Sequence, residues 1–176
     1  MMVALDIKNM VFLDESGITT QMLRLYGRTL GGQRVHDSAP GQWRTLTLLG
    51  AVTLGGWLAT MTIESPTDGD VFLAFLEHVL CPKLQAGHVV VMDNLSSHKV
   101  AGVRELIEAT GAQVRYLPPY SPDFNPIEKC WAQLKQHLRA LKARSVTALE
   151  SGVALALETL TPFNIEGYFR HCGYAL

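Results

Sequence analysis

The sequence predicts an α/β protein whose mixed β-sheet is flanked by helices. Two observations point to this class: strand-like apolar runs dominate the first third of the chain, and helical spacing alternates with short apolar runs after it. This order indicates three antiparallel strands followed by alternating helices and strands. With 176 residues, 48% of them hydrophobic, the chain suits a single domain over residues 1–176.

The expected strands are short apolar or β-rich runs. They lie at residues 11–13, 20–26, 45–53, 57–63, 89–92 and 113–117. Gly55 and Gly56 suit a tight hairpin between the runs at 45–53 and 57–63. The segment 27–41 is rich in Gly and Arg, so we expect a mobile loop there.

Apolar residues at helical spacing predict the helices. They are expected over 70–84, from Ser96 or Ser97 to about 109, over 126–141, and from Ser145 to about 160 as the last element. The helix at 126–141 carries a continuous apolar stripe. The three tryptophans, Trp43, Trp57 and Trp131, are expected in the core.

The composition argues against several classes of protein. The net charge of −1 excludes a broadly basic surface, so any contact with nucleic acid must come from local clusters of Lys and Arg. The three cysteines are far apart and form no CxxC pair, which argues against a zinc site or a disulfide framework. We see no export signal and no apolar run that could span a membrane, so a cytoplasmic protein is expected.

Two acidic residues directly follow apolar runs. Asp14 comes after residues 10–13, and Asp93 comes after residues 89–92. An ionised carboxylate at such a place requires water, a hydrogen bond or a cation, although Asp at a strand end is also a common turn former. Glu15 is expected to point to the opposite face of its strand, so Asp14 is the better ligand candidate.

A third acid, Glu128, follows Asp93 after 34 intervening residues and lies in the first turn of an expected helix. Its place at the edge of the apolar stripe suits a helix whose first turn covers strand ends. Three facing acids are typical of two-metal phosphoryl transfer. The stretch from Asn125 through Pro126 to Glu128 also has the pattern of a helix cap, an interpretation that requires no catalysis.

Five segments together resemble a known family. They are FLDESG at 12–17, YGR and GQR within 26–34, VVMDNLSSHK at 90–99, LPPYSPDFNPIEKCWAQLK at 117–135 and YFRHCGYAL at 168–176. Over nearly its whole length the chain is similar to the catalytic domain of bacterial insertion-sequence transposases related to the mariner group. These transposases belong to the DDE superfamily, so the resemblance implies a ribonuclease-H-like fold.

The resemblance also implies a chemistry and partners. Asp14, Asp93 and Glu128 take the positions of a catalytic triad that holds two Mg²⁺ or Mn²⁺ ions for DNA strand cleavage and strand transfer. Asn94 and His98 are expected to support these acids or to contact the substrate. The implied partners are transposon ends and TA-rich target DNA, bound by a homodimer in a synaptic complex associated with the nucleoid.

Basic residues outside the triad are candidates for DNA contacts. The candidates are Arg28, Arg34, Lys99, Lys135, Arg139 and Lys142. The last three fall at i, i+4 and i+7, which predicts a phosphate track down one helix face, with a merely solvated basic face as the alternative.

Members of this family usually carry N-terminal helix-turn-helix modules, and this chain begins almost at the first catalytic strand. We therefore expect the DNA-recognition region to be absent here. Three origins stay open: the second reading frame of a split transposase, for which a separate helix-turn-helix polypeptide is a candidate partner, a truncated copy, and an isolated domain. Two other functions stay open from sequence. One is a catalytically silent DNA-binding or assembly remnant of a transposase. The other is a haloacid-dehalogenase-type phosphatase, whose second Asp would stand where this chain has Ser16.

Overall fold

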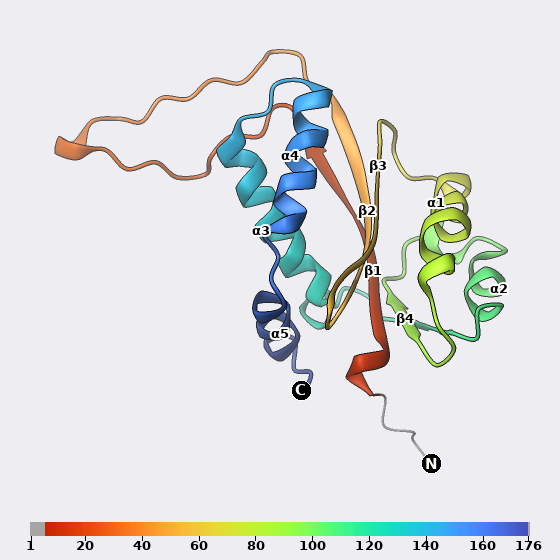
Figure 1. Cartoon of the computed structure of the whole chain (residues 1–176). Coiled ribbons are helices and arrows are strands. Elements are labelled where there is room, and N and C mark those ends of the chain that lie inside the picture. Colours follow the sequence, from red (N-terminus) through yellow and green to blue (C-terminus); the bar gives the residue numbers. More distant parts are fainter. Residues whose placement is uncertain (1–5, 176) are drawn as a thin grey trace.

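A five-stranded mixed sheet forms the centre of the protein (Figure 1). The computed structural model describes residues 6–175. The strands are β1 (Met10–Thr19), β2 (Thr45–Thr53), β3 (Gly56–Ile63), β4 (Val89–Met92) and β5 (Gln113–Tyr116), in the spatial order β3-β2-β1-β4-β5. The first three pair antiparallel, while β4 runs parallel to both β1 and β5. The predicted mixed sheet with an antiparallel beginning is therefore confirmed.

Helices cover both faces of this sheet (Figure 1). One face packs against α3 (Pro126–Leu141), α4 (Val146–Glu158) and α5 (Pro162–His171). The other packs against α1 (Gly69–Phe75), which continues through a π-helical turn (Leu76–Leu80) and a 3-10 turn (Cys81–Lys83), and against α2 (Val103–Glu108). Further 3-10 turns lie at Ile7–Asn9, Leu30–Gly32, Ser97–Lys99 and Pro122–Phe124. Within residues 6–175, no helix combines the length and the apolar character that crossing a bilayer requires.

The alternation of side chains along β1 determines which face receives each acid. Val11 and Leu13 belong to the core on the α1 side, whereas Phe12 belongs to the core on the α3 side. Because successive side chains of a strand point to opposite faces, Asp14 follows Phe12 toward α3 and Glu15 points toward the α1 side. The predicted separation of these two acids agrees with the structure.

Several predicted elements differ from the observed ones. Residues 20–26 do not form a strand, because β1 extends to Thr19 and the chain then leaves the sheet. No helix starts at Ser96 or Ser97: a 3-10 turn is followed by Gly102, whose left-handed backbone (φ 98°) precedes α2. The Gly102 N–H donates to the Glu105 carboxylate at 3.0 Å and so caps this helix.

The C-terminal part contains a helix that we did not predict. After α4, Thr161 accepts the Asn164 N–H and caps α5, with Pro162 at the first helical position. The tryptophan prediction is wrong at one place, because Trp43 is 56% exposed, while Trp131 is buried and Trp57 is partly buried against the core.

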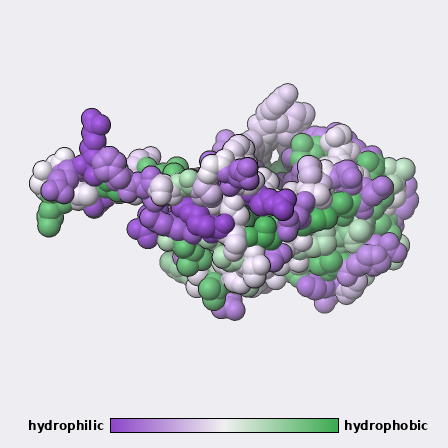
Figure 2. All heavy atoms as spheres, turned by 90° about the horizontal axis from the view of Figure 1, so that it is seen from above, coloured by the Kyte–Doolittle hydropathy of each residue, from purple (hydrophilic) through white to green (hydrophobic). Residues whose placement is uncertain are grey.

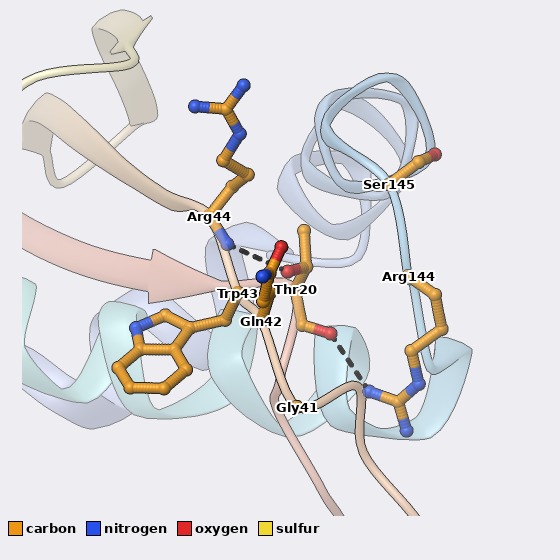
Figure 3. A pocket seen from close by; sticks show the side chains of 7 residues that line it. All are labelled: Thr20, Gly41, Gln42, Trp43, Arg44, Arg144 and Ser145. Atoms are coloured by element: carbon orange, nitrogen blue, oxygen red, sulfur yellow. Dashed lines mark hydrogen bonds between the residues drawn. The ribbon is translucent and has the colours of Figure 1, made fainter.

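Residues 21–44, between β1 and β2, form an arm that projects far from the body of the molecule (Figures 1 and 2). Most of its side chains are exposed, including Leu25, Tyr26 and Leu30. Arg144, between α3 and α4, holds the base of the arm by donating to the carbonyls of Thr20, Met22 and Ser38 at 3.0–3.1 Å. Figure 3 shows the contact of Arg144 with Thr20.

Candidate active site

The first two acids leave neighbouring strands at the same level of the sheet. Phe12 of β1 pairs with Val91 of the parallel strand β4, and Asp14 and Asp93 each stand two residues further along. Parallel neighbours keep the same direction, so equal steps along both strands bring the two acids to one edge region. The chain thus places Asp14 and Asp93 side by side at the carboxyl end of β4.

The third acid comes from the helix that packs over this region. Glu128 stands in the first turn of α3, whose N-cap is Asn125, and α3 packs against β1. One turn further on, the indole Nε1 of Trp131 donates a hydrogen bond to Oδ2 of Asp14 at 3.2 Å. This contact ties the first turns of α3 to Asp14 and brings Glu128 to the acids of the sheet.

The electrostatics of Asp14 reflect this gathering of acids. Its side chain is 5% exposed, and its pKa is raised from 3.8 to about 7. Burial is the largest cause of this higher pKa, and the negative charges of Glu128 and Asp93 raise it further. A hydrogen bond from the Glu15 backbone and the His98 ring act in the opposite direction. The charges of Glu128 and Asp93 therefore couple all three acids electrostatically at Asp14.

The pKa of Asp93 is lowered rather than raised, because hydrogen-bond donors contact its carboxylate. Burial raises its pKa, but the His98 side chain and the Leu95 backbone N–H outweigh that effect, so the pKa of Asp93 lies below its usual range. Nδ1 of His98 lies 2.7 Å from Asp93 Oδ1, and the Leu95 N–H donates to the same oxygen at 3.0 Å. These two contacts favour an ionised and well-oriented carboxylate.

Of the two residues predicted as supports or substrate contacts, His98 is buried within the fold, whereas Asn94 is partly buried and lines the cavity beside Asp93. His98 is fully buried and its ring packs on Phe72 with 4.4 Å between the centroids. The Tyr116 hydroxyl donates to the His98 carbonyl at 2.9 Å, and Asn94 Nδ2 donates to the Leu117 carbonyl. His98 is thus placed to support Asp93 and is withdrawn from the surface where a substrate would bind.

The structure does not contain the helix cap that the sequence allows at Asn125. The Asn125 N–H donates to the Pro122 carbonyl at 2.9 Å, and the Asn125 side chain makes no capping hydrogen bond. Glu128 is exposed, and its carboxylate has no hydrogen bond or ion pair within the described residues. A capping box would require the Asn125 N–H for Glu128, so this acid has no structural partner that explains its place.

A cavity of about 480 Å³ opens at Asp93 and Glu128. Asn94 and Leu95 also line it, and the rest of its wall comes from the proline-rich segment that joins β5 to α3, including the fully exposed Tyr120. Asp14 is not part of this wall. Tyr120 adopts a left-handed backbone (φ 55°), which is unusual for a side chain of its size. The cavity therefore combines two acids with an apolar rim.

The donor set fits a hard divalent cation. Carboxylate oxygens are the ligands that Mg²⁺ and Mn²⁺ prefer, and the charges of Glu128 and Asp93 both act on the buried Asp14. Within residues 6–175, no three His, Cys, Asp or Glu side chains are already close enough to hold a metal ion. Binding an ion at this site therefore requires a side-chain movement, and Glu128 is the acid without any partner to release.

The candidate DNA contacts lie on three parts of the molecule. Arg28 and Arg34 are exposed on the arm, and Lys99 lies over the Tyr116 ring at 5.7 Å from its centroid. On α3, Lys135 is half-buried near the acids: burial lowers its pKa, while the charges of Glu128 and Asp14 raise it.

The predicted basic track along α3 ends earlier than expected. Arg139 borders a hollow of about 650 Å³ between α3 and the arm, together with Arg24 and Tyr26. The helix ends at Leu141, and Lys142 has a left-handed backbone (φ 53°) that turns away from the helical path. Its ammonium group pairs with Asp37 of the arm at 2.9 Å. Lys142 therefore does not continue the helix face of Lys135 and Arg139.

The order and direction of the strands, with helices on both faces, define a ribonuclease-H-like domain. The sequence profile of the DDE superfamily endonucleases matches residues 9–150, which include all three acids. The chain therefore belongs to the DDE superfamily of endonucleases. This membership gives no support to a haloacid-dehalogenase-type phosphatase.

Solved structures of mariner transposase have the same fold. A Mos1 transposase paired-end complex with the left transposon end matches with a TM-score of 0.76 at 17% identity, over 95% of this chain and 52% of that one. A Mos1 mariner paired-end complex with Mn gives 0.76 at 17% identity, over 96% of this chain and 52% of that one. The corresponding complex with Mg gives 0.71 at 16% identity, over 95% and 54% of the two chains.

The chain spans about half the length of these transposases. A search of curated protein sequences finds no significant match.

Proposed function

We propose that this chain is the catalytic domain of a DDE transposase and that it performs metal-dependent DNA strand cleavage and strand transfer. The observation that carries the proposal is that Asp14 and Asp93 leave neighbouring parallel strands and Glu128 stands in the first turn of α3, in a chain of the DDE superfamily. The related Mos1 complexes with Mn and with Mg support the use of a divalent ion. We assign two ions to the three acids by analogy with two-metal phosphoryl transfer.

Each acid has a separate part in the proposed site. When bound, divalent ions supply the positive charge that stabilises the attacking and leaving oxygens of a phosphodiester. Asp93, held by His98 and the Leu95 N–H, offers a fixed carboxylate. Asp14 offers a buried carboxylate from β1, and Glu128 closes on both from α3. We assign to Lys135 a contact with a non-bridging phosphate oxygen, and its electrostatic interaction with Glu128 and Asp14 supports this role.

DNA is the proposed substrate and partner. Arg28, Arg34, Lys99 and Arg139 are the proposed phosphate contacts outside the acidic site, whereas Lys142 is paired with Asp37 of the arm at 2.9 Å. We further propose that two copies of the chain form a homodimer that pairs two transposon ends. The proposed partners are a separate helix-turn-helix polypeptide and a TA-rich target DNA. Since the net charge is −1, the isolated chain is expected to bind DNA weakly and with strong salt dependence.

A nicking assay tests the proposal. The chain, alone and mixed with a helix-turn-helix partner, is incubated with supercoiled DNA in Mn²⁺, in Mg²⁺ and in EDTA. We expect nicking only with a metal and its loss in Asp93→Asn. Glu77→Gln is the matched control, because Glu77 is an exposed acid that follows α1 on the opposite face of the sheet. Metal binding without nicking in any mixture would instead favour a catalytically silent remnant.

A further inference from the structure

Trp131 contacts one of the proposed metal ligands directly. It is 2% exposed, and its Nε1–H donates to Asp14 Oδ2 at 3.2 Å across 117 residues of sequence. Trp131 follows Glu128 by three residues, so both side chains lie on the same side of α3. A single helix therefore carries one acid of the cluster and the hydrogen-bond donor to another.

The indole of Trp131 is held in a slot formed by β2 and β3. Its ring packs against Trp57 of β3 with 4.9 Å between the centroids and 34° between the planes. Gly50 of β2 is the direct ladder partner of Asp14. A Cβ atom at Gly50 would lie 2.5 Å from Trp131 Cη2 and 2.9 Å from Trp57 Cζ3, closer than real Cβ atoms approach. The absence of a side chain at Gly50 thus makes room for the indole beside Asp14.

The two stacked tryptophans differ in what their polar groups do. Within the described residues, the buried Nε1 of Trp57 has no hydrogen-bond partner, whereas Nε1 of Trp131 is directed to the carboxylate. Buried indole N–H groups usually find an acceptor, and a carboxylate is a stronger acceptor than a backbone carbonyl. Trp57 therefore acts as packing, and Trp131 has a specific polar contact as well.

We propose that Trp131 is a positioning residue that fixes the orientation of the Asp14 carboxylate by holding Oδ2 and leaving Oδ1 to ligate a divalent cation. No side chain within the described residues donates to Oδ1. This inference rests on the proposed metal-dependent function. Without the indole donor, the carboxylate can rotate about its last torsion, and the free oxygen is no longer aimed in one direction.

Calorimetric titration of the whole chain with Mn²⁺ tests this role without any activity measurement. Trp131→Phe keeps an aromatic ring but removes the donor, and we expect it to bind Mn²⁺ roughly tenfold or more weakly, as is typical when the outer partner of a metal ligand is lost. Trp57→Phe is the matched control: it changes the same ring stack but leaves the donor to Asp14, so its Mn²⁺ affinity should equal that of the wild type.

A double-mutant cycle shows whether Trp131 acts through Asp14. In an Asp14→Asn background, Trp131→Phe should cause no further loss of Mn²⁺ affinity. An equal loss in both backgrounds, or an unchanged affinity in Trp131→Phe alone, overturns the positioning role. A wild-type chain that binds no Mn²⁺ overturns the proposed function and this inference together, whereas tight wild-type binding with an inert Trp131→Phe overturns only the inference.

The indole N–H resonance gives a second test that does not depend on how Trp131→Phe folds. The chain has three tryptophans, so single Trp43→Phe and Trp57→Phe variants assign the Trp131 signal by elimination. We expect this signal to move in Asp14→Asn and on addition of diamagnetic Mg²⁺ to the wild type. If the Trp131 signal shifts neither in Asp14→Asn nor on addition of Mg²⁺, the indole is only part of the core and the positioning role is wrong.

Discussion

Gly50 and Asp14 are direct partners across the β1–β2 ladder, and the glycine leaves the space that the Trp131 ring fills beside the carboxylate. The architecture of this site therefore depends on a residue without a side chain in the neighbouring strand.

Gly50→Ala should destabilise the fold. The new methyl group meets two rigid aromatic rings at 2.5 and 2.9 Å, and neither ring can move without disturbing the core. Overpacking of this kind typically costs about 1–3 kcal/mol in the free energy of unfolding, which urea denaturation measures. Gly17→Ala is the matched control in β1, because a Cβ there meets nothing within 4 Å. Equal stability of the two variants would show that the slot for Trp131 is less rigid than described.

The raised pKa of Asp14 predicts an unusual dependence of stability on pH. Below about pH 4 this carboxyl is protonated in both the folded and the unfolded chain. Between about pH 4 and 7 the unfolded chain releases the proton while the folded chain keeps it, so the folded state loses stability as the pH rises. The full effect, present above pH 7, is on the order of 4 kcal/mol for a shift from 3.8 to about 7.

Asp14→Asn removes this titration and supplies the measurement. In EDTA, we expect the variant to be more stable than the wild type at about pH 8 and close to it at about pH 4, as measured by urea denaturation. A divalent ion should reverse the order at pH 8, since it stabilises only a folded state that can bind it. A difference between variant and wild type that stays constant with pH would contradict the assignment of the raised pKa to Asp14.

Arg144 predicts how firmly the arm is attached. Its guanidinium group donates to three carbonyls at the base of the arm, so Arg144→Gln removes three contacts at once. We expect faster trypsin cleavage within residues 21–44 and little change in the thermal midpoint, because the core is not affected. Lys142→Gln is the control, since it removes a single ion pair at the surface, with Asp37, and keeps all three contacts of Arg144. If trypsin cleaves both variants at similar rates, the Arg144 side chain does not hold the arm in place.

The sheet could largely be predicted from the sequence because its strands are apolar runs with clear ends. The run before Asp93 matches β4 residue for residue, and the alternation along β1 separates Asp14 from Glu15 correctly. The β-prone side chains of residues 20–26 predict a strand, but this prediction is wrong because no neighbouring strand lies beyond Thr19 to pair with them.

The supports of the site can be predicted only in part: the family resemblance names His98 as a candidate support, and the structure places its ring 2.7 Å from Asp93, but nothing in the sequence gives such a role to Trp131. Trp131 was expected only as core, although its position one turn after Glu128 was visible. Its contact with Asp14 joins residues 117 positions apart, and the space for its indole ring depends on Gly50 of β2. Likewise, burial of His98 follows from its packing on Phe72. Such contacts arise from tertiary packing, which local spacing does not encode.

Glu128→Gln separates a catalytic acid from a helix cap. The Asn125 N–H is already bonded to the Pro122 carbonyl, and Glu128 has no partner in the described part of the chain, so no capping bond is lost. Removing its charge should also relieve the repulsion that raises the pKa of Asp14. We therefore expect a thermal midpoint in EDTA equal to or slightly above that of the wild type.

Metal-dependent nicking should respond very differently to the same substitution. A neutral amide holds a divalent ion more weakly where charge develops during phosphoryl transfer, and loss of such a contact typically lowers the rate roughly a hundredfold or more. Glu150→Gln, an exposed glutamate on α4, is the matched control and should nick DNA like the wild type. Both variants are assayed in the mixture, with or without a helix-turn-helix partner, in which the wild type nicks DNA. If Glu128→Gln then nicks DNA at the wild-type rate, the site works with two acids, and the third ligand must be sought elsewhere.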